Sequence, residues 1–269
     1  MVDWRDILKA QLFSTVCWYR NNKWMLITTF VWPYLMVGTI FGIGMALGSL
    51  EEYAERVGVV NPALYLLASS AVAMSSVYIM YSITGFVLEN RWIGTLPYLL
   101  LSPAKTHTVI VFSSLPDALT SPVFTAIAII PAAVYFEGFT GALRIFIVLL
   151  ITILGMLPLM GLSVIMASTI LFLKEESNIM GSVVPFILLV SGVYYPIEVL
   201  PRVLQVISQF VPVTYVVEAT KIVSTYLTSE ARMLMVALYM IGLLTVGYNL
   251  LATLAMTKVE RAIKSKGAL

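Results

Sequence analysis

Six long apolar segments dominate this 269-residue sequence, and they restrict its fold more than any other feature does. A helix that crosses a bilayer needs about 20 mainly apolar residues. The candidate segments cover about residues 24–48, 62–87, 109–135, 144–172, 179–195 and 232–256, of which the fifth is short. Because 60% of the residues are hydrophobic and the mean hydropathy is +0.95, the sequence predicts an all-α integral membrane protein with six transmembrane helices. We expect residues 1–269 to form a single transmembrane domain, without room for a soluble domain of ordinary size.

The distribution of charge predicts the orientation of these helices. Cytoplasmic loops carry an excess of Lys and Arg, and six spans leave both termini on the same side. A cytoplasmic N-terminus places eleven of the 16 basic residues inside, namely Arg5, Lys9, Arg20, Lys23, Arg91, Lys105, Lys174, Lys258, Arg261, Lys264 and Lys266. We therefore expect a multi-pass protein of the cell (plasma) membrane with both termini cytoplasmic. The net charge of +2 is too small to indicate a nucleic-acid partner.

Residues 3–23 predict an amphipathic helix that lies on the inner membrane surface. Trp4, Ile7, Leu8 and Leu12 recur at helical spacing, while charged and amide side chains occupy the other side. A merely solvated basic segment is the alternative. Membrane lipids are the expected partner of the apolar side.

Residues 190–223 are too apolar for an ordinary loop and too interrupted for a membrane span. They contain three prolines and four charged side chains, namely Pro196, Pro201, Pro212, Glu198, Arg202, Glu218 and Lys221. A lipid-exposed helix would not tolerate these residues. Within residues 196–230 the pattern predicts two short re-entrant or external half-helices, near 200–211 and 214–226, packed on protein on one side of the membrane.

The connection at residues 88–108 is the longest cytoplasmic loop, and it predicts a short helix over 95–102. Thr95 is a good N-cap residue, Pro97 falls in the first turn and Pro103 ends the segment. Much of the surface of this helix is apolar, and an exposed apolar surface needs a partner. The helix could pack in the lipid headgroups, on its own bundle or on another protein.

Two blocks of the sequence resemble the membrane subunits of ABC-2 type ABC transporters. One block is Glu89-Asn-Arg-Trp-Ile-Gly-Thr-Leu followed by Leu-Leu-Leu-Ser-Pro at 99–103; the other is Ser191-Gly-Val-Tyr-Tyr-Pro, then Leu200-Pro201, then Pro212-Val-Thr-Tyr-Val-Val-Glu-Ala. The order of Pro, Leu-Pro and Pro-x-Thr-Tyr-x-x-Glu-Ala is the more specific of the two. The chain departs from the family pattern at Asn90 and Pro97.

The resemblance implies a transport subunit rather than an enzyme. Such subunits pair with a second permease copy or paralogue, and each binds a cytoplasmic ABC ATPase (nucleotide-binding) subunit. The 95–102 helix would be the coupling helix, and the residues expected to couple to the ATPase are Glu89, Arg91, Gly94, Thr95, Leu96 and Leu99. Because the sequence contains no phosphate loop, we expect ATP and Mg on the partner subunit and no cofactor on this chain. The family implies outward transport, by alternating access, of an amphipathic, lipid- or glycan-like or drug substrate.

Five residues are candidates for the substrate path or gate, namely Tyr81, Asp117, Tyr194, Tyr195 and Glu218. The resemblance places the path at the dimer interface, lined by spans two and five, with the interrupted stretch as the outer lid. Asp117 is costly at membrane depth unless it faces the bundle, water or a basic partner; a span that starts near 118 would leave it at the cytoplasmic interface instead. Glu218 could hold the lid against the spans or form a local helix pair with Lys221. Tyr81 could also be a packing residue.

Small residues in the first four spans predict close helix–helix seams. They include Gly38, Gly42, Ala68, Ser69, Gly155 and Gly161.

Two other functional classes are left as alternatives. An ion-coupled secondary transporter usually places several carboxylates within its spans, whereas Asp117 is the main one here. An intramembrane aspartyl protease would need two such carboxylates, and a Ser–His dyad would need His107, which falls in a predicted loop. Because His107 has no Cys, His or Asp cluster near it and Cys17 is the single cysteine, the sequence predicts no metal site and no internal disulfide.

Overall fold

A computed structural model describes residues 4–47, 55, 61–102, 105–173, 179–195, 197–225 and 231–265. Every element in these ranges is helical, which confirms the predicted all-α class. The helices are α1 (Trp4–Asn21), α2 (Lys23–Leu47), α4 (Pro62–Ile93), α5 (Leu96–Leu101), α6 (Thr106–Leu173), α7 (Ile179–Val190), the 3-10 helix η1 (Ile197–Val199), α8 (Arg202–Ser208), α9 (Pro212–Thr225) and α10 (Ala231–Ser265).

Three of the described helices are long and apolar enough to cross a membrane, which supports an integral membrane protein. They are α4, α6 and α10, and the α8–α9 pair would be a fourth if the two helices, bent by 87°, formed one span. The sequence predicts six spans, which is more than these three or four helices. α6 covers the third and fourth predicted segments, α2 covers the first, and α7, which covers the fifth, is short. Six spans therefore remain a prediction.

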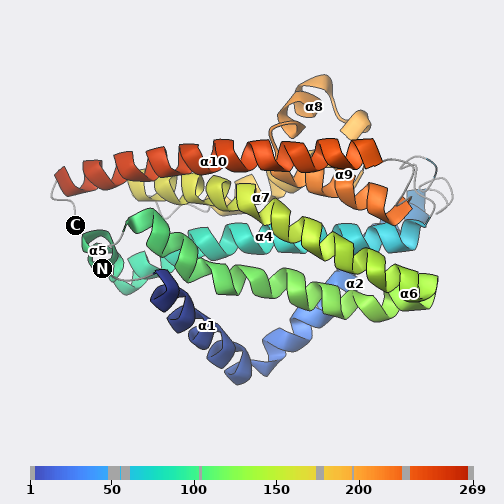
Figure 1. The fold of residues 1–269 in the computed structure, drawn as a ribbon, viewed down its shortest axis with the longest axis horizontal. Helices are drawn as coiled ribbons and strands as arrows, with labels where there is room; N and C mark the ends of the chain where they lie inside the picture. The colour runs from blue at the N-terminus through green and yellow to red at the C-terminus, as the bar shows by residue number, and fades with distance from the viewer. Residues whose placement is uncertain are drawn as a thin grey trace.

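α6 is two helices joined at a break rather than one rod. A straight helix of its 68 residues would be about 100 Å long, more than three times the thickness of the hydrocarbon core. At Gly138 the backbone leaves the helical region (φ 63°, ψ −149°), and Figure 1 shows the ribbon of α6 turning back into a second arm. The predicted segments 109–135 and 144–172 fall on the two arms, and the connection between them is little more than this glycine.

α7 is shorter than the predicted fifth span, 179–195. It has 12 residues and ends at Val190, which corresponds to about 18 Å. The chain then turns through Gly192, whose φ of 80° is readily adopted only by glycine. The turn places Tyr194 and Tyr195 outside the helix. The sequence prediction extends the span to residue 195 because an apolar composition does not show where a glycine redirects the backbone.

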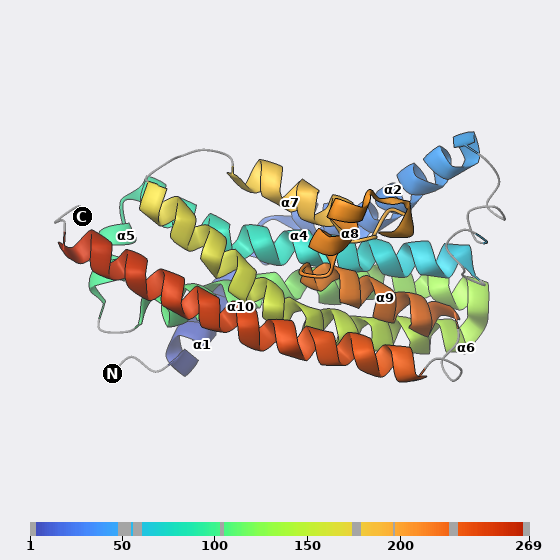
Figure 2. The same ribbon diagram turned by 90° about the horizontal axis from the view of Figure 1, so that it is seen from above.

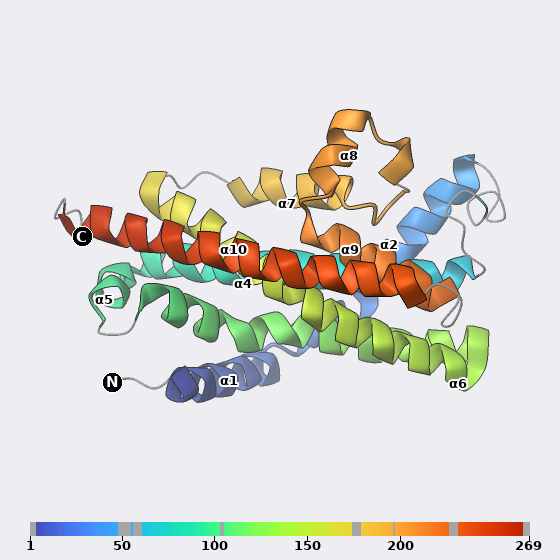
Figure 3. The same ribbon diagram turned by 45° about the horizontal axis from the view of Figure 1, so that its top comes forward.

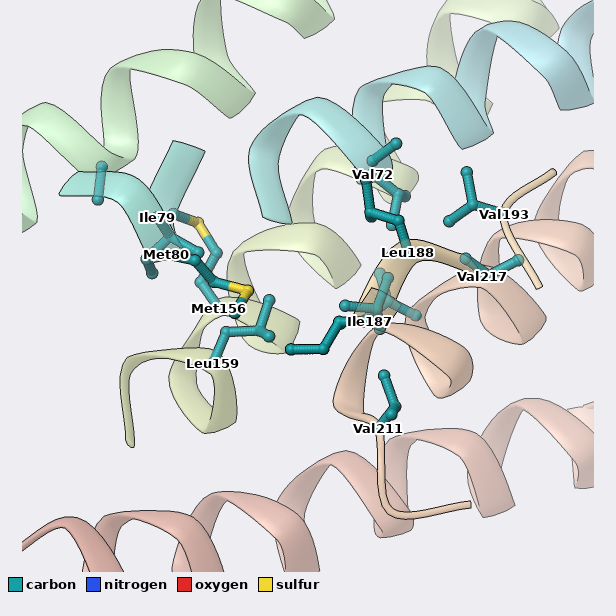
Figure 4. Packing of buried hydrophobic residues seen from close by; sticks show 14 of the residues in the cluster. Val72, Ile79, Met80, Met156, Leu159, Ile187, Leu188, Val193, Val211 and Val217 are labelled. Carbon is teal, nitrogen blue, oxygen red and sulfur yellow. The ribbon is translucent and has the colours of Figure 1, made fainter. Parts of the chain in front are cut away.

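The core is built around α4, which the other helices surround. Most of the apolar part of α4 is buried (78%), whereas that of α10 is largely exposed (17%), as expected for a helix that faces lipid. Figure 4 shows Ile187 and Leu188 of α7 near Val72 of α4 and Val217 of α9. α9 is therefore part of the packed core rather than a segment on its surface.

Close approach of helices at glycines confirms two predicted seams. A Cβ atom on Gly161 of α6 would lie 2.7 Å from the carbonyl carbon of Tyr248 in α10. A Cβ on Gly155 would overlap the side chain of Val216 in α9. Gly38 of α2, by contrast, has open space around it, so its predicted seam does not form within the described protomer.

α1 packs beside the first arm of α6 and exposes a second apolar side. Figure 3 shows it beside α6, on the side of the bundle away from α8. The ring of Trp4 lies 5.3 Å from that of Phe112, and Tyr19 is buried. Leu12 is exposed rather than packed against the protein, so it is available for the lipid contact that the sequence predicts for this helix.

Candidate functional site

The corner between α4 and α5 is built from hydrogen bonds that end one helix and start the next. Gly94 adopts a left-handed conformation (φ 81°, ψ 12°), and its N–H donates to the carbonyl oxygen of Arg91 (3.1 Å). The N–H of Thr95 donates to the carbonyl oxygen of Asn90 (2.9 Å), which is the pattern of a Schellman helix end. Because α4 continues to Ile93, Glu89 and Arg91 lie in its last turns and not in the loop 88–108.

Thr95 and Asn90 fasten this corner through their side chains. The expected capping bond from the Thr95 side chain to α5 is absent; the Thr95 hydroxyl donates instead to Asn90 Oδ1 (2.8 Å). Asn90 in turn donates to the carbonyl oxygen of Phe86 (2.8 Å). Thr95 is therefore the N-cap of α5, as predicted, but its side chain makes no capping bond, and Pro97 lies in the first turn of α5, also as predicted. Asn90 departs from the family pattern, and its side chain is a structural part of the corner.

The side chains around α5 divide into an inward and an outward set. Leu96 and Leu99 pack half-buried on the core, and Leu100 is buried. The outward set consists of Trp92 (69% exposed), Ile93 (66%), Tyr98 (77%) and Leu101 (61%). We call these four residues the α5 patch. Sequence reasoning omitted them from its coupling set because the direction of each side chain depends on how the corner is folded.

A polar network joins α1, α4 and α6 near Asp117. The hydroxyl of Tyr19 lies 3.2 Å from that of Tyr78 and 3.0 Å from Thr120 Oγ1. The carboxylate of Asp117 lies against the hydroxyls of Tyr78 and Ser82. Asp117 is thus half-buried inside α6 and faces α4, which is the bundle-facing arrangement that the sequence analysis considered.

Tyr81 takes no part in this network, although it is only three residues from Tyr78. It is the one strongly exposed residue in the middle of α4 (42%), whose other faces are covered. The described part of the chain therefore leaves the side chain of Tyr81 uncovered.

Tyrosine hydroxyls donate to main-chain carbonyl groups at the bend between α8 and α9 and at the turn after α7. The hydroxyl of Tyr248 in α10 donates to the carbonyl oxygen of Phe210 (2.6 Å), at the bend between the two helices. The hydroxyl of Tyr195 donates to the carbonyl oxygen of Leu189 (2.7 Å), and Tyr194 packs half-buried on the core. The predicted half-helices near 200–211 and 214–226 correspond to α8 and α9.

Glu218 lies on the open side of α9. It is exposed, whereas its neighbours Val217 and Ala219 are buried. Lys221, three residues further along α9, interacts electrostatically with Glu218.

An ion pair between Glu137 and Arg144 was not anticipated from the sequence. Arg144 Nη1 lies 3.2 Å from Glu137 Oε2, and the two side chains are 23% and 17% exposed. Asn61 donates to Glu137 Oε1 (2.9 Å), and Arg144 donates to the carbonyl oxygen of Ser224 (2.7 Å). We call these four residues the outer clasp. The opposite charges of Glu137 and Arg144 on either side of Gly138 could have predicted the ion pair. The contacts to Asn61 and Ser224 could not be predicted in this way, because those residues are far away in the sequence.

A pocket between α4 and the two arms of α6 is too small for a substrate. It holds about 10 Å³ and is lined by Ala71, Ser75, Pro122, Ala126, Ile129 and Thr152, among others. This volume admits about one water molecule. Among the described residues, no group of three or more His, Cys, Asp or Glu side chains could hold a metal ion.

A family model described as "ABC-2 type transporter" matches residues 12–225. The match covers most of the chain, from α1 to the end of α9. No curated protein matches the chain.

Proposed function

This chain belongs to the ABC-2 type transporter family and is a membrane permease, and we propose that it exports its substrate by alternating access, driven by ATP hydrolysis on a separate subunit. The observation that carries the proposal is the α5 patch, an exposed apolar and aromatic surface on a rigid corner at one end of the bundle. Figure 1 shows α5 near both termini and far from the Gly138 turn of α6.

The α5 patch has the composition of a protein-docking surface. Trp and Tyr carry much of the binding energy in protein interfaces, because they bury large areas with few rotatable bonds. Trp92 and Tyr98 stand out from a corner fixed by Gly94 and Asn90, so docking would cost little additional order. Glu89 and Arg91 lie in the preceding turns of α4 and would flank the docked ATPase.

α4 connects this corner to the rest of the molecule. It is one helix of 32 residues, about 48 Å long, so a displacement of α5 is carried along its axis. Tyr78 and Ser82 link α4 to Asp117, and α4 also packs on α9. We assign Asp117 to conformational coupling rather than to substrate contact, since its carboxylate faces α4.

The substrate path is proposed to lie between two copies of the chain. The pocket between α4 and α6 is too small for a substrate, whereas Tyr81 of α4 and Phe186 of α7 are exposed on the surface of the described chain. In Figure 2, α7 lies on the side of the bundle away from α10, and α8 lies beside α7. An amphipathic, lipid- or glycan-like or drug substrate suits walls of this composition, with α8 and α9 as the outer gate and Tyr194, Tyr195 and Glu218 beside it.

Site-specific photo-cross-linking tests the function in native membranes. A photoreactive amino acid replaces Tyr98, and a control chain carries it in place of Tyr239, an equally exposed tyrosine of α10 (69%). We expect a cross-link from position 98 to a protein with a phosphate loop and Walker-type ATPase sequence, and none to that protein from position 239. Capture of lipid alone at position 98, or of the ATPase at both positions, would contradict the proposal.

A further inference from the structure

The four residues of the outer clasp belong to the start of α4, the break in α6 and the end of α9. Asn61 is the N-cap of α4, and its side-chain oxygen accepts the N–H of Leu64 (3.1 Å) while its amide holds Glu137. Glu137 and Arg144 stand on the two sides of the Gly138 break. Ser224 lies in the last turn of α9. The clasp therefore joins α4 and both arms of α6 to the end of the re-entrant helix.

Arg144 supplies what the end of α9 needs electrostatically. The last carbonyl groups of a helix lack intrahelical partners and form the negative end of its dipole. A guanidinium donates charge-assisted hydrogen bonds, which are about twice as strong as neutral ones. Asn61 donates to Glu137, and Glu137 pairs with Arg144. These contacts orient the guanidinium toward the Ser224 carbonyl independently of α9.

Two buried hydroxyl groups of α9 lack a hydrogen-bond partner where the helix packs on the bundle. The hydroxyls of Thr214 and Thr220 are buried without a hydrogen-bond partner among the described residues. Each such group loses its hydration without compensation, and access of water would restore it. The packed position of α9 thus carries an internal cost that favours a wetter, displaced position.

We propose that Arg144 is a positioning residue of the outer gate: its bond to the Ser224 carbonyl holds α9 in the closed seat and breaks when the gate opens. Asn61, Glu137 and Arg144 stay together on α4 and α6 as the fixed half of the clasp. Since Asn61 caps the same helix that carries the α5 corner at its other end, a shift of α4 reaches the clasp directly. This inference rests on the proposed function, because it takes α9 to be a gate.

Cysteine accessibility tests the clasp without ATP or a partner. In a Cys17→Ser background, Thr220→Cys places the reporter at a fully buried position of α9. The protein is held in lipid nanodiscs, which expose both membrane sides, and is treated with a polar maleimide. We expect Arg144→Ala to raise the labelling rate about tenfold, equivalent to about 1.4 kcal/mol of gate closure.

Matched variants separate gate opening from loss of structure. Arg232→Ala removes an exposed cation at the start of α10 and should leave the rate unchanged. A second reporter, Ala167→Cys, is buried in α6 and should stay unlabelled in the Arg144→Ala chain. Labelling of Thr220→Cys at the parent rate, or equal gains at both reporters, would overturn the proposal.

A second variant covers the case in which Arg144→Ala does not fold. Glu137→Gln keeps the shape of the side chain and its contact with Asn61 but frees Arg144 from the ion pair. We expect a severalfold faster labelling of Thr220→Cys, and a parent rate would again refute the clasp. Unchanged labelling with an intact ATPase cross-link at position 98 would reject the clasp alone, whereas faster labelling without any cross-link would reject the transport proposal alone.

Discussion

Single residues determine where the apolar helices of this protein stop. Gly94, Gly138 and Gly192 have positive φ, and each ends a helix or redirects the chain. A side chain at such a position meets its own backbone, so the conformation belongs to glycine. The polar residues that matter are placed by these breaks: Asn90 at the first and Glu137 with Arg144 around the second.

Replacement of Gly138 tests the cost of the break in α6. Its φ of 63° with ψ of −149° lies in a region essentially restricted to glycine. We expect Gly138→Ala to destabilise the protein by about 1–3 kcal/mol, measured by thermal unfolding in detergent. Gly242→Ala, in the middle of α10 with open space around it, is the control and should be neutral or slightly stabilising. Equal losses in the two variants would contradict the strained turn.

Removal of the Tyr78 hydroxyl tests the polar network. Tyr78→Phe loses the contacts to Tyr19 and Asp117. A hydrogen bond contributes about 1 kcal/mol, so hydrogen exchange in α1 should accelerate about fivefold, as followed by mass spectrometry. Tyr135→Phe removes a hydroxyl from an exposed ring (85%) and should change nothing. Unchanged exchange in α1 would show that the network does not hold this helix.

The mutation of Asp117 addresses coupling rather than packing. Asp117→Asn keeps hydrogen-bonding capacity and removes the charge, so folding should persist. We expect ATP-driven flux to fall severalfold while the cross-link from position 98 to the ATPase is retained. If flux were unchanged, Asp117 would have no role in the mechanism.

At the scale of helices, close packing rather than hydrophobic attraction holds the helices of this protein together. Lipid chains are as apolar as the helix surfaces, so helices in a membrane associate through packing at small residues. Gly155 lets α6 meet α9, and Gly161 lets it meet α10. The second arm of α6 is therefore the element on which the re-entrant helix and the last span both rest.

Overpacking of the α6–α10 seam has a measurable effect. Gly161→Ala pushes a methyl group toward the backbone of Tyr248 and should destabilise the protein by about 1–3 kcal/mol. Gly247→Ala, one residue before Tyr248 and facing open space, is the matched control. Thermal unfolding in detergent compares the two. The seam would be refuted if both variants unfolded at the temperature of the parent.

At the scale of the whole molecule, the two ends of the bundle differ in chemistry. The α5 end offers an apolar and aromatic surface, and the opposite end holds the outer clasp. α4 reaches from one to the other, with Gly94 at its C-terminal end and Asn61 as its N-cap. This arrangement suits the proposed mechanism, in which a displacement of α5 moves α4 and breaks the contact between Arg144 and Ser224.

The proposed pairing of two copies predicts a particular cross-link. In the Cys17→Ser background, Phe186→Cys places a thiol on the exposed side of α7 (45%), and Leu250→Cys places one on the exposed side of α10 (60%). We expect disulfide-linked dimers from the first and not from the second, detected by non-reducing electrophoresis of oxidised membranes. Dimers formed through α10 would place the substrate path on a different face.

The sequence by itself determined the class of the protein, most of its helices and the existence of an interrupted stretch before the last span. Apolar length and proline position act locally, so they are legible in one dimension. Only the tertiary structure decided that Leu96 and Leu99 point inward while Trp92 and Tyr98 point outward, that Asp117 faces Tyr78, and that Arg144 reaches Ser224. Those contacts join residues on different helices, and their geometry depends on the packing of the whole bundle around α4.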